Sequence, residues 1–139
     1  MQRWDTRQKN LLVILARDVA SKLATPMFVV DGDGTLVYFN EAAEPLLGES
    51  FADAGEKKRE EWWDTYAPID AHGARIPFEH LPLGIALTQG RPAHKNFRIR
   101  GTDGIERPLA STAIPLLAHQ NDIVGAVALF WKEPHEEGS

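Results

Sequence analysis

Cysteine is absent from this chain of 139 residues. Its absence excludes disulfide bonds, thiolate nucleophiles, iron–sulfur clusters and thiolate-ligated zinc sites together, and it is consistent with a reducing compartment. The sequence also lacks an apolar run near the roughly 20 residues that cross a bilayer, and its N-terminus lacks the basic-then-apolar layout of a signal peptide. We therefore expect a cytoplasmic protein without a membrane-spanning segment.

Positive charge is also scarce, since 15 lysines and arginines face 20 aspartates and glutamates and leave a net charge of −5. Nucleic-acid binding depends largely on clustered basic residues, so we expect no direct nucleic-acid partner. The charges are unevenly spread: residues 41–64 hold eight acids and three bases, and residues 91–107 hold five bases and two acids. These segments are either solvated faces or surfaces of opposite sign that steer self-association.

The sequence offers no catalytic or metal-binding set. Four histidines fall on expected turns, on a polar strand face or in the tail, without a partner at the spacing of metal ligands on a helix: His72, His94, His119 and His135. Ser111 is the one serine on an expected core strand, and the topology places no histidine near it. The other positions expected to face a pocket on the sheet are apolar, which leaves no general acid or base there. We therefore predict that the protein is not an enzyme.

Apolar residues make up 43% of the chain, which is enough for one compact core. Residues 4–24 repeat apolar groups at helical spacing and predict an amphipathic helix. Pro26 ends this helix, because the residue before a proline is pushed out of helical geometry. We divide the chain into this N-terminal helix (residues 1–24), a folded domain (residues 25–133) and a polar tail (residues 134–139).

Two apolar runs around residues 31–34, Asp-Gly-Asp-Gly, predict a hairpin, since glycine and aspartate tolerate the backbone angles of tight turns. The side-chain oxygen of Asn40 is placed to cap a helix that starts at Glu41. The two aspartates also resemble the start of a calcium loop, but Leu36 and Ala42 stand where that loop requires glycine and glutamate. We therefore interpret this stretch as a turn followed by a helix cap.

The remaining sequence predicts helices followed by strands. Residues 41–48 predict a short helix and residues 79–89 a longer one that ends before a glycine. Three β-type runs follow, in residues 95–101, 108–115 and 123–131. The order is helix, two strands, short helices, a longer helix and three strands, which predicts an α+β fold with a five-stranded antiparallel sheet.

This order of elements resembles that of a PAS domain. The opening hairpin with its cap, the Gly-x-x-Ile-Pro turn in residues 72–77, the Leu-Pro-Leu helix that ends at Gly90, the hairpin after Phe97 and the last strand all resemble parts of that family. The resemblance spans residues 25–132. It implies a sensory module, not itself an enzyme, in which the sheet and flanking helices enclose a pocket and a signal leaves through the sheet or the terminal helices.

Members of the PAS family bind several cofactors, and each cofactor requires residues that can be looked for in this sequence. Flavin photochemistry of the light-oxygen-voltage type and chromophore attachment of the yellow-protein type both need a cysteine, so both are excluded. Haem-binding relatives use a histidine on or near the longer helix, and only His80 lies there, in the first turn instead of the pocket-facing middle. We therefore expect no haem, and the sequence identifies no other cofactor.

An apolar pocket is the candidate site, and a filled core without a cavity is the alternative, because protein interiors usually close-pack. Tyr66 and Ser111 are the expected lining residues able to orient a polar group of a ligand. The expected lining consists of Phe28, Val30, Phe39, Leu47, Trp63, Tyr66, Leu83, Leu87, Phe97, Ile99, Leu109, Ser111 and Leu129.

The last strand carries apolar residues on both faces, so the face away from the core must also be covered. The N-terminal helix, from the same chain or from a partner, is the expected cover, and we predict a homodimer on this basis. The predicted dimer interface consists of Leu12, Leu15, Val19, Leu23, Val127 and Trp131.

Together these features predict a PAS sensory module that homodimerises, binds a small apolar or amphipathic ligand and regulates a partner protein. A ligand-free PAS adaptor for protein–protein contacts is the second hypothesis. A small cone-shaped α+β isomerase or hydrolase ranks last, because it requires a buried aspartate or histidine on the inner face of the sheet, which this sequence lacks. Relatives often continue through Asp-Ile-Thr into an output domain, whereas this chain reads Lys132-Glu133-Pro134, which puts covalent C-terminal output in doubt.

Overall fold

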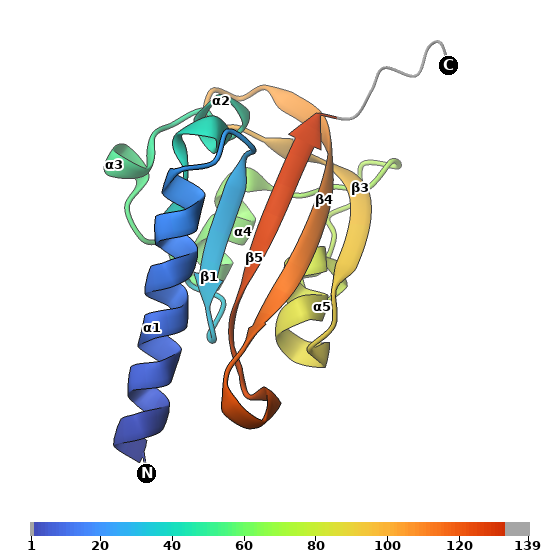
Figure 1. The fold of residues 1–139 in the computed structure, drawn as a ribbon. Helices are drawn as coiled ribbons and strands as arrows, with labels where there is room; N and C mark the ends of the chain where they lie inside the picture. The colour runs from blue at the N-terminus through green and yellow to red at the C-terminus, as the bar shows by residue number, and fades with distance from the viewer. Residues whose placement is uncertain (1, 133–139) are drawn as a thin grey trace.

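Five antiparallel strands form one sheet with the order β2-β1-β5-β4-β3 (Figure 1). The computed structural model describes residues 2–132, so the predicted polar tail at residues 134–139 lies outside the described residues. The predicted α+β fold with a five-stranded antiparallel sheet is confirmed. The strands are β1 (Met27–Asp31), β2 (Leu36–Phe39), β3 (Ala93–Arg100), β4 (Glu106–Leu117) and β5 (Ile123–Lys132).

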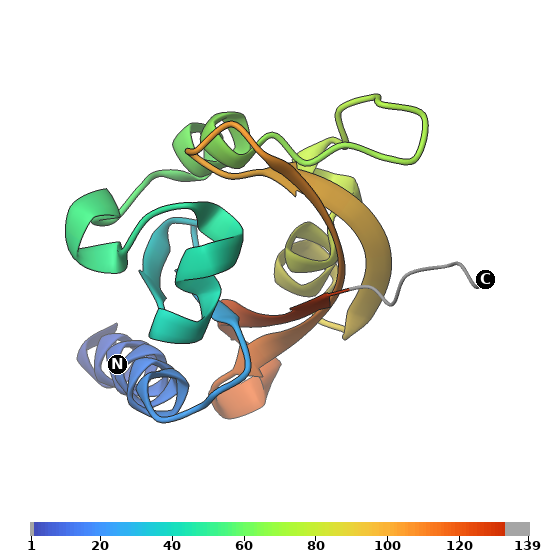
Figure 2. The same ribbon diagram turned by 90° about the horizontal axis from the view of Figure 1, so that it is seen from above.

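The helices meet the two faces of the sheet differently. Seen from above in Figure 2, the sheet curves around α5, while α1 lies outside the curve beside β1. The α-helices of residues 2–132 are α1 (Gln2–Ser21), α2 (Glu44–Leu47), α3 (Phe51–Ala54), α4 (Arg59–Tyr66) and α5 (Pro82–Gln89). Short 3-10 turns are found at η1 (Glu41–Ala43), η2 (Phe78–His80) and η3 (His119–Asn121).

The predicted turn joins β1 to β2. The Oδ1 atom of Asp31 accepts hydrogen bonds from the backbone N–H groups of Asp33 and Thr35, at 2.9 and 3.1 Å. Gly34 has a φ of 85°, a left-handed conformation that glycine adopts without a steric penalty. The first aspartate therefore closes a tight turn, as the sequence predicts.

Two helix boundaries differ from the predictions. The N-terminal helix ends at Ser21, three residues before the predicted end. The predicted helix over residues 79–89 is divided, because Leu81 is extended ahead of Pro82 and separates η2 from α5. A Cβ atom at Gly84 would collide with the carbonyl oxygen of Phe78, so η2 packs directly against the first turn of α5.

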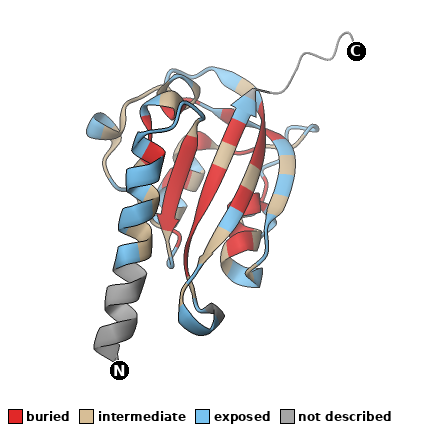
Figure 3. Ribbon diagram, viewed as in Figure 1, coloured by how far each residue is buried: buried red, intermediate tan, exposed pale blue. Residues whose placement is uncertain are grey.

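Buried side chains line both faces of the sheet, as the red segments of β1 and β5 in Figure 3 show. The outer cluster, on the side of α1, consists of Ala20, Met27, Val29, Val37 and Val127. The inner cluster, on the side of α5, consists of Phe28, Val30, Leu36, Phe39, Ala43, Leu47, Trp62, Tyr66, Ile76, Leu81, Leu83, Ala86, Phe97, Ile99, Leu109, Ala113, Ala126, Ala128 and Phe130.

The pairing of β1 with β5 brings distant parts of the chain together. Met27 lies opposite Leu129, and the register continues to Asp31 opposite Gly125. Beyond the strand, the N–H group of Phe130 donates a 3.0 Å hydrogen bond to the carbonyl oxygen of Pro26. The segment that leaves α1 and the end of β5 therefore lie side by side.

Candidate functional site

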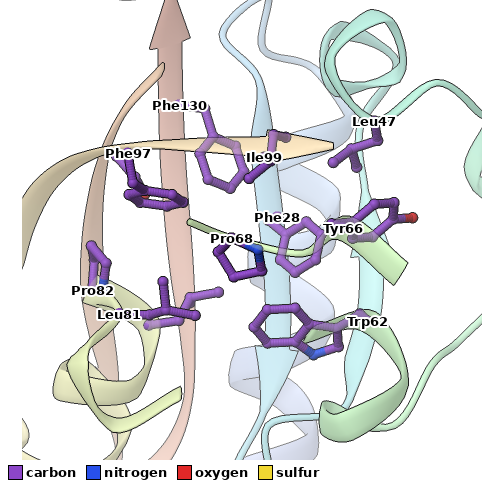
Figure 4. A pocket seen from close by; sticks show the side chains of 12 residues that line it. Phe28, Leu47, Trp62, Tyr66, Pro68, Leu81, Pro82, Phe97, Ile99 and Phe130 are labelled. Atoms are coloured by element: carbon purple, nitrogen blue, oxygen red, sulfur yellow. The ribbon is translucent and has the colours of Figure 1, made fainter. Parts of the chain in front are cut away.

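A small cavity of about 40 Å³ lies inside the inner cluster, and we call it the core cavity (Figure 4). Both the sheet and the helices contribute to its wall. The lining residues are Phe28, Leu47, Trp62, Tyr66, Pro68, Leu81, Pro82, Leu83, Phe97, Ile99, Ser111 and Phe130. A single water needs about 10–15 Å³ by this kind of measure and benzene fits a cavity of about 150 Å³, so the core cavity accommodates only a few non-hydrogen atoms.

Aromatic rings form much of the wall, and Phe28 is their common neighbour. Its ring packs edge to face against Trp62, Phe130 and Tyr66, with centroid distances of 5.3, 5.9 and 6.2 Å. Edge-to-face pairs of this kind contribute about 0.5–1.5 kcal/mol each beyond the buried area. The rings therefore hold the cavity wall in a defined arrangement.

Two polar groups in the wall are already bonded elsewhere. The indole N–H of Trp62 donates to the carbonyl oxygen of Gly34 at 2.8 Å. The hydroxyl of Tyr66 donates to Oε2 of Glu49 at 2.7 Å, and Figure 4 shows this hydroxyl directed away from the ring of Phe28. Burial, reinforced by the bond to Glu49, raises the pKa of Tyr66 well above its usual range. The phenol therefore remains a neutral donor.

The structure brings seven of the predicted pocket residues to the core cavity: Phe28, Leu47, Tyr66, Leu83, Phe97, Ile99 and Ser111. Val30, Phe39 and Leu109 are buried in the same cluster but do not line the cavity. Trp63 and Leu87 pack against the cluster from its periphery. Whether the lining residues bind a ligand stays a prediction.

Leu129 was predicted in the pocket, and this placement is wrong. It packs with the outer cluster, because the alternation of side chains along β5 places Ala128 and Phe130 on the inner face. The sequence analysis also left out five lining residues. These are Trp62, Pro68, Leu81, Pro82 and Phe130.

Trp62 and Trp63 show why part of the lining could not be predicted. They are consecutive on α4, where each residue turns about 100° from the last, so only one of the two can face the core. The Trp63 indole instead donates to the carbonyl oxygen of Ile76 at 2.8 Å, and the guanidinium of Arg75 lies 3.8 Å from its ring centroid. Only the orientation of α4, set by the tertiary packing, selects Trp62.

One side of α1 is packed and the opposite side is exposed. Val13 and Ala16 pack against the outer cluster, and Ala20 belongs to it. We call the exposed apolar residues the α1 stripe, and their exposed fractions lie between 41% and 59%. The α1 stripe consists of Leu11, Ile14, Leu15 and Val19 on α1, together with Leu23, which lies two residues after the helix ends.

The predicted dimer residues divide between these two environments. Leu15, Val19 and Leu23 lie in the α1 stripe, and Trp131 is 40% exposed near the end of β5. Leu12 is half-buried. Val127 is covered within its own chain, in the cluster against which α1 packs, so its assignment to the interface is wrong.

Asn40 connects α1 to the domain. Its side chain is 1% exposed and makes five hydrogen bonds. The Oδ1 atom accepts from the N–H groups of Met27 and Ala43, and the second of these bonds is the predicted helix cap. The Nδ2 group donates to three carbonyl oxygens where α1 ends and β1 begins, those of Ala20, Leu23 and Thr25.

The histidines do not converge on a site. His80 is exposed in η2 and does not line the core cavity, and His72 is exposed in a turn. His94 bonds Thr112 through Nδ1 at 2.9 Å and stacks on Trp131, while His135 lies outside the described residues. Among the described side chains, no group of three or more His, Asp or Glu residues is placed to hold a metal ion.

Comparison with known proteins agrees with this architecture. A family model described as PAS fold matches residues 21–132, so the chain belongs to the PAS fold family of sensory and signalling domains. A search of curated proteins gives no match. No helix among residues 2–132 is long and apolar enough to cross a membrane.

Solved structures share the fold at low sequence identity. The PAS domain of BvgS from Bordetella pertussis is 15% identical with a TM-score of 0.58, over 88% of this chain and 86% of that chain. The PAS domain of an HTR-like protein from Haloarcula marismortui is 14% identical with a TM-score of 0.57, over 96% of this chain and 100% of that chain. The LOV protein of Rhodobacter sphaeroides is 12% identical with a TM-score of 0.66, over 94% of this chain and 70% of that chain. The predicted resemblance to PAS domains is confirmed.

Proposed function

We propose that this PAS domain acts as a homodimer that associates through the α1 stripe. The exposure of the stripe carries the proposal, because its five large apolar side chains remain exposed although the other side of α1 is packed. Single exposed apolar residues are common, but a continuous stripe at helical spacing is typical of an interaction surface. Burial of each side chain against a partner would contribute about 1–2 kcal/mol.

A second copy of the chain is the partner that fits this surface. Two identical apolar stripes complement each other about a twofold axis without a specialised partner. Two charged residues beside the stripe, Lys22 and Asp18, already form an ion pair with each other at 2.8 Å and need no partner of opposite sign. Trp131 and Ile114, 40% and 41% exposed, add apolar surface on the sheet.

We further propose that a small apolar or amphipathic molecule in the core cavity supplies the input and that the dimer regulates a partner protein. Phe28 and Phe130 line the cavity from β1 and β5, and α1 packs on the other face of the same two strands. A shift of these two strands on ligand binding would therefore act directly on α1. The small volume of the cavity favours the alternative, a ligand-free adaptor.

Light scattering after size exclusion tests the homodimer. Leu15→Glu places a charge in the α1 stripe at a position that is 49% exposed, so the variant should fold normally and elute as a monomer. Ile105→Glu is the matched control, because Ile105 is 54% exposed in the β3–β4 turn and lies outside the stripe. A dimeric Leu15→Glu variant, or a monomeric wild type at micromolar concentration, would overturn the proposal.

Native mass spectrometry of protein purified from cells tests whether a small molecule occupies the core cavity. A retained small molecule at one per chain supports ligand sensing. A mass that equals the bare chain in both dimer and monomer supports the ligand-free adaptor.

A further inference from the structure

Ser111 is a buried polar residue in the wall of the core cavity. It lies within β4, opposite Lys95 on β3 and Phe130 on β5, and its residue is 1% exposed. It lines the core cavity. Its hydroxyl makes no hydrogen bond to any residue in the described part of the chain. A buried hydroxyl in this state loses its bonds to water and gains nothing in return.

The hydroxyl of Ser111 opens onto the cavity. Among the side chains that the structure describes, every nitrogen or oxygen atom that is fully sealed from solvent has a hydrogen-bond partner. The unbonded Ser111 hydroxyl therefore keeps some free surface, and the free space at this residue is the cavity that it lines. This surface is available to a molecule inside the cavity.

The rest of the wall offers no comparable group. The Trp62 N–H is bonded to Gly34 and the Tyr66 hydroxyl to Glu49, and the other lining side chains are hydrocarbon. A buried water usually makes about three hydrogen bonds, so a water beside Ser111 would be poorly held. A molecule with one polar group and an apolar body matches the wall better.

Charge and size limit the molecule further. No charged side chain lines the cavity, so an ion would lose its hydration without compensation. The volume of about 40 Å³ limits the occupant to a few non-hydrogen atoms. We propose that the core cavity selects small, neutral, amphipathic molecules of the size of a short alcohol, with the polar group bonded to the Ser111 hydroxyl. This inference rests on the proposed ligand-sensing function.

Titration with ethanol and propane tests the proposal, because these molecules have nearly the same shape and differ in a hydroxyl against a methyl group. The methyl NMR signals of Leu47, Leu83 and Ile99 report binding to the full chain. We expect Ser111→Ala to weaken ethanol binding about fivefold, the effect of one neutral hydrogen bond, and to leave propane binding unchanged. Thr112→Ala is the matched control, because it removes a hydroxyl that bonds His94 on the outer face of the same strand.

Thermal unfolding without ligand supplies a second measurement. Ser111→Ala removes an unpaired buried hydroxyl, so its melting temperature should equal or exceed that of the wild type. A lower melting temperature would show that the hydroxyl is bonded within the protein and would overturn the proposal.

The outcomes separate this proposal from the proposed function. If propane shifts the cavity methyl signals and Ser111→Ala leaves ethanol binding unchanged, the cavity is a ligand site but Ser111 does not select the ligand. If neither molecule shifts these signals in the wild type, the proposed ligand input and the role of Ser111 both fail. The light-scattering experiment tests the homodimer independently of either result.

Discussion

The two faces of the sheet are covered in different ways. The inner cluster draws on all five strands and on α2, α4 and α5, and it closes around aromatic rings. The outer cluster contains Ala20 of α1 and four strand residues beneath that one helix, all of them smaller than the aromatic residues of the inner cluster. Bulky side chains from many elements therefore fill the inner face except for the small core cavity, whereas one helix covers the outer face and leaves its own far side apolar and exposed.

Replacement of one buried residue on each face provides the strongest contrast. Phe28→Ala should lower the free energy of unfolding by about 4 kcal/mol, because it leaves a cavity among Trp62, Tyr66 and Phe130. Val29→Ala, the next residue on β1 and part of the outer cluster, should cost about 2 kcal/mol. Urea unfolding with unchanged m-values measures both losses. Equal losses would contradict the difference between the faces.

Asn40→Ala tests the link between the outer helix and the inner domain. It removes five hydrogen bonds and leaves buried N–H and C=O groups unpaired, so we expect a loss of about 3 kcal/mol. Hydrogen exchange should increase most in residues 20–27, where α1 joins β1. Ser50→Ala removes another N-cap, that of α3, and should cost only about 1 kcal/mol. Unchanged exchange in residues 20–27 would refute the link.

Tyr66→Phe produces the smallest of these effects and tests the polar edge of the inner cluster. The variant loses the bond to Glu49, which should cost about 1 kcal/mol at neutral pH. The pKa of Tyr66 is raised in the folded protein, so the folded state retains a proton that the unfolded state releases above about pH 10. Wild-type stability should therefore fall as the pH rises above 10.

Thermal unfolding between pH 8 and 11 measures this dependence. The Tyr66→Phe variant should lose less stability than the wild type over the same range, because it lacks the titrating phenol. Parallel curves would show that Tyr66 ionises in the folded protein as it does in the unfolded chain.

Local signals in the sequence predicted much of the fold. The Asp31 turn and the Asn40 cap depend on residues within a few positions, and both were predicted correctly. The bonds from Asn40 to Ala20 and Thr25 could not be predicted, because only the folded chain brings these carbonyl groups to it. The cap therefore also fastens α1, a role that no local pattern indicates.

The candidate site was less predictable because it depends on how the elements face one another. Leu129 and Val127 are apolar residues on a strand with two buried faces, so alternation alone did not show which face was closed within the chain. Leu81 and Pro82 were missed because the break between η2 and α5 determines how they approach the cavity. In each case the prediction required knowledge of the tertiary packing.

The neighbouring positions of Pro26 and Phe130 have a mechanical consequence. Because β1 and β5 are antiparallel, the start of one strand lies beside the end of the other. A pulling force applied between these two points would load the hydrogen bonds between the strands one after another, from Met27–Leu129 toward Asp31–Gly125, instead of all together. The centre of the sheet would open like a zipper, so the domain should yield to a weak tension along this direction while it resists one applied along the length of the strands.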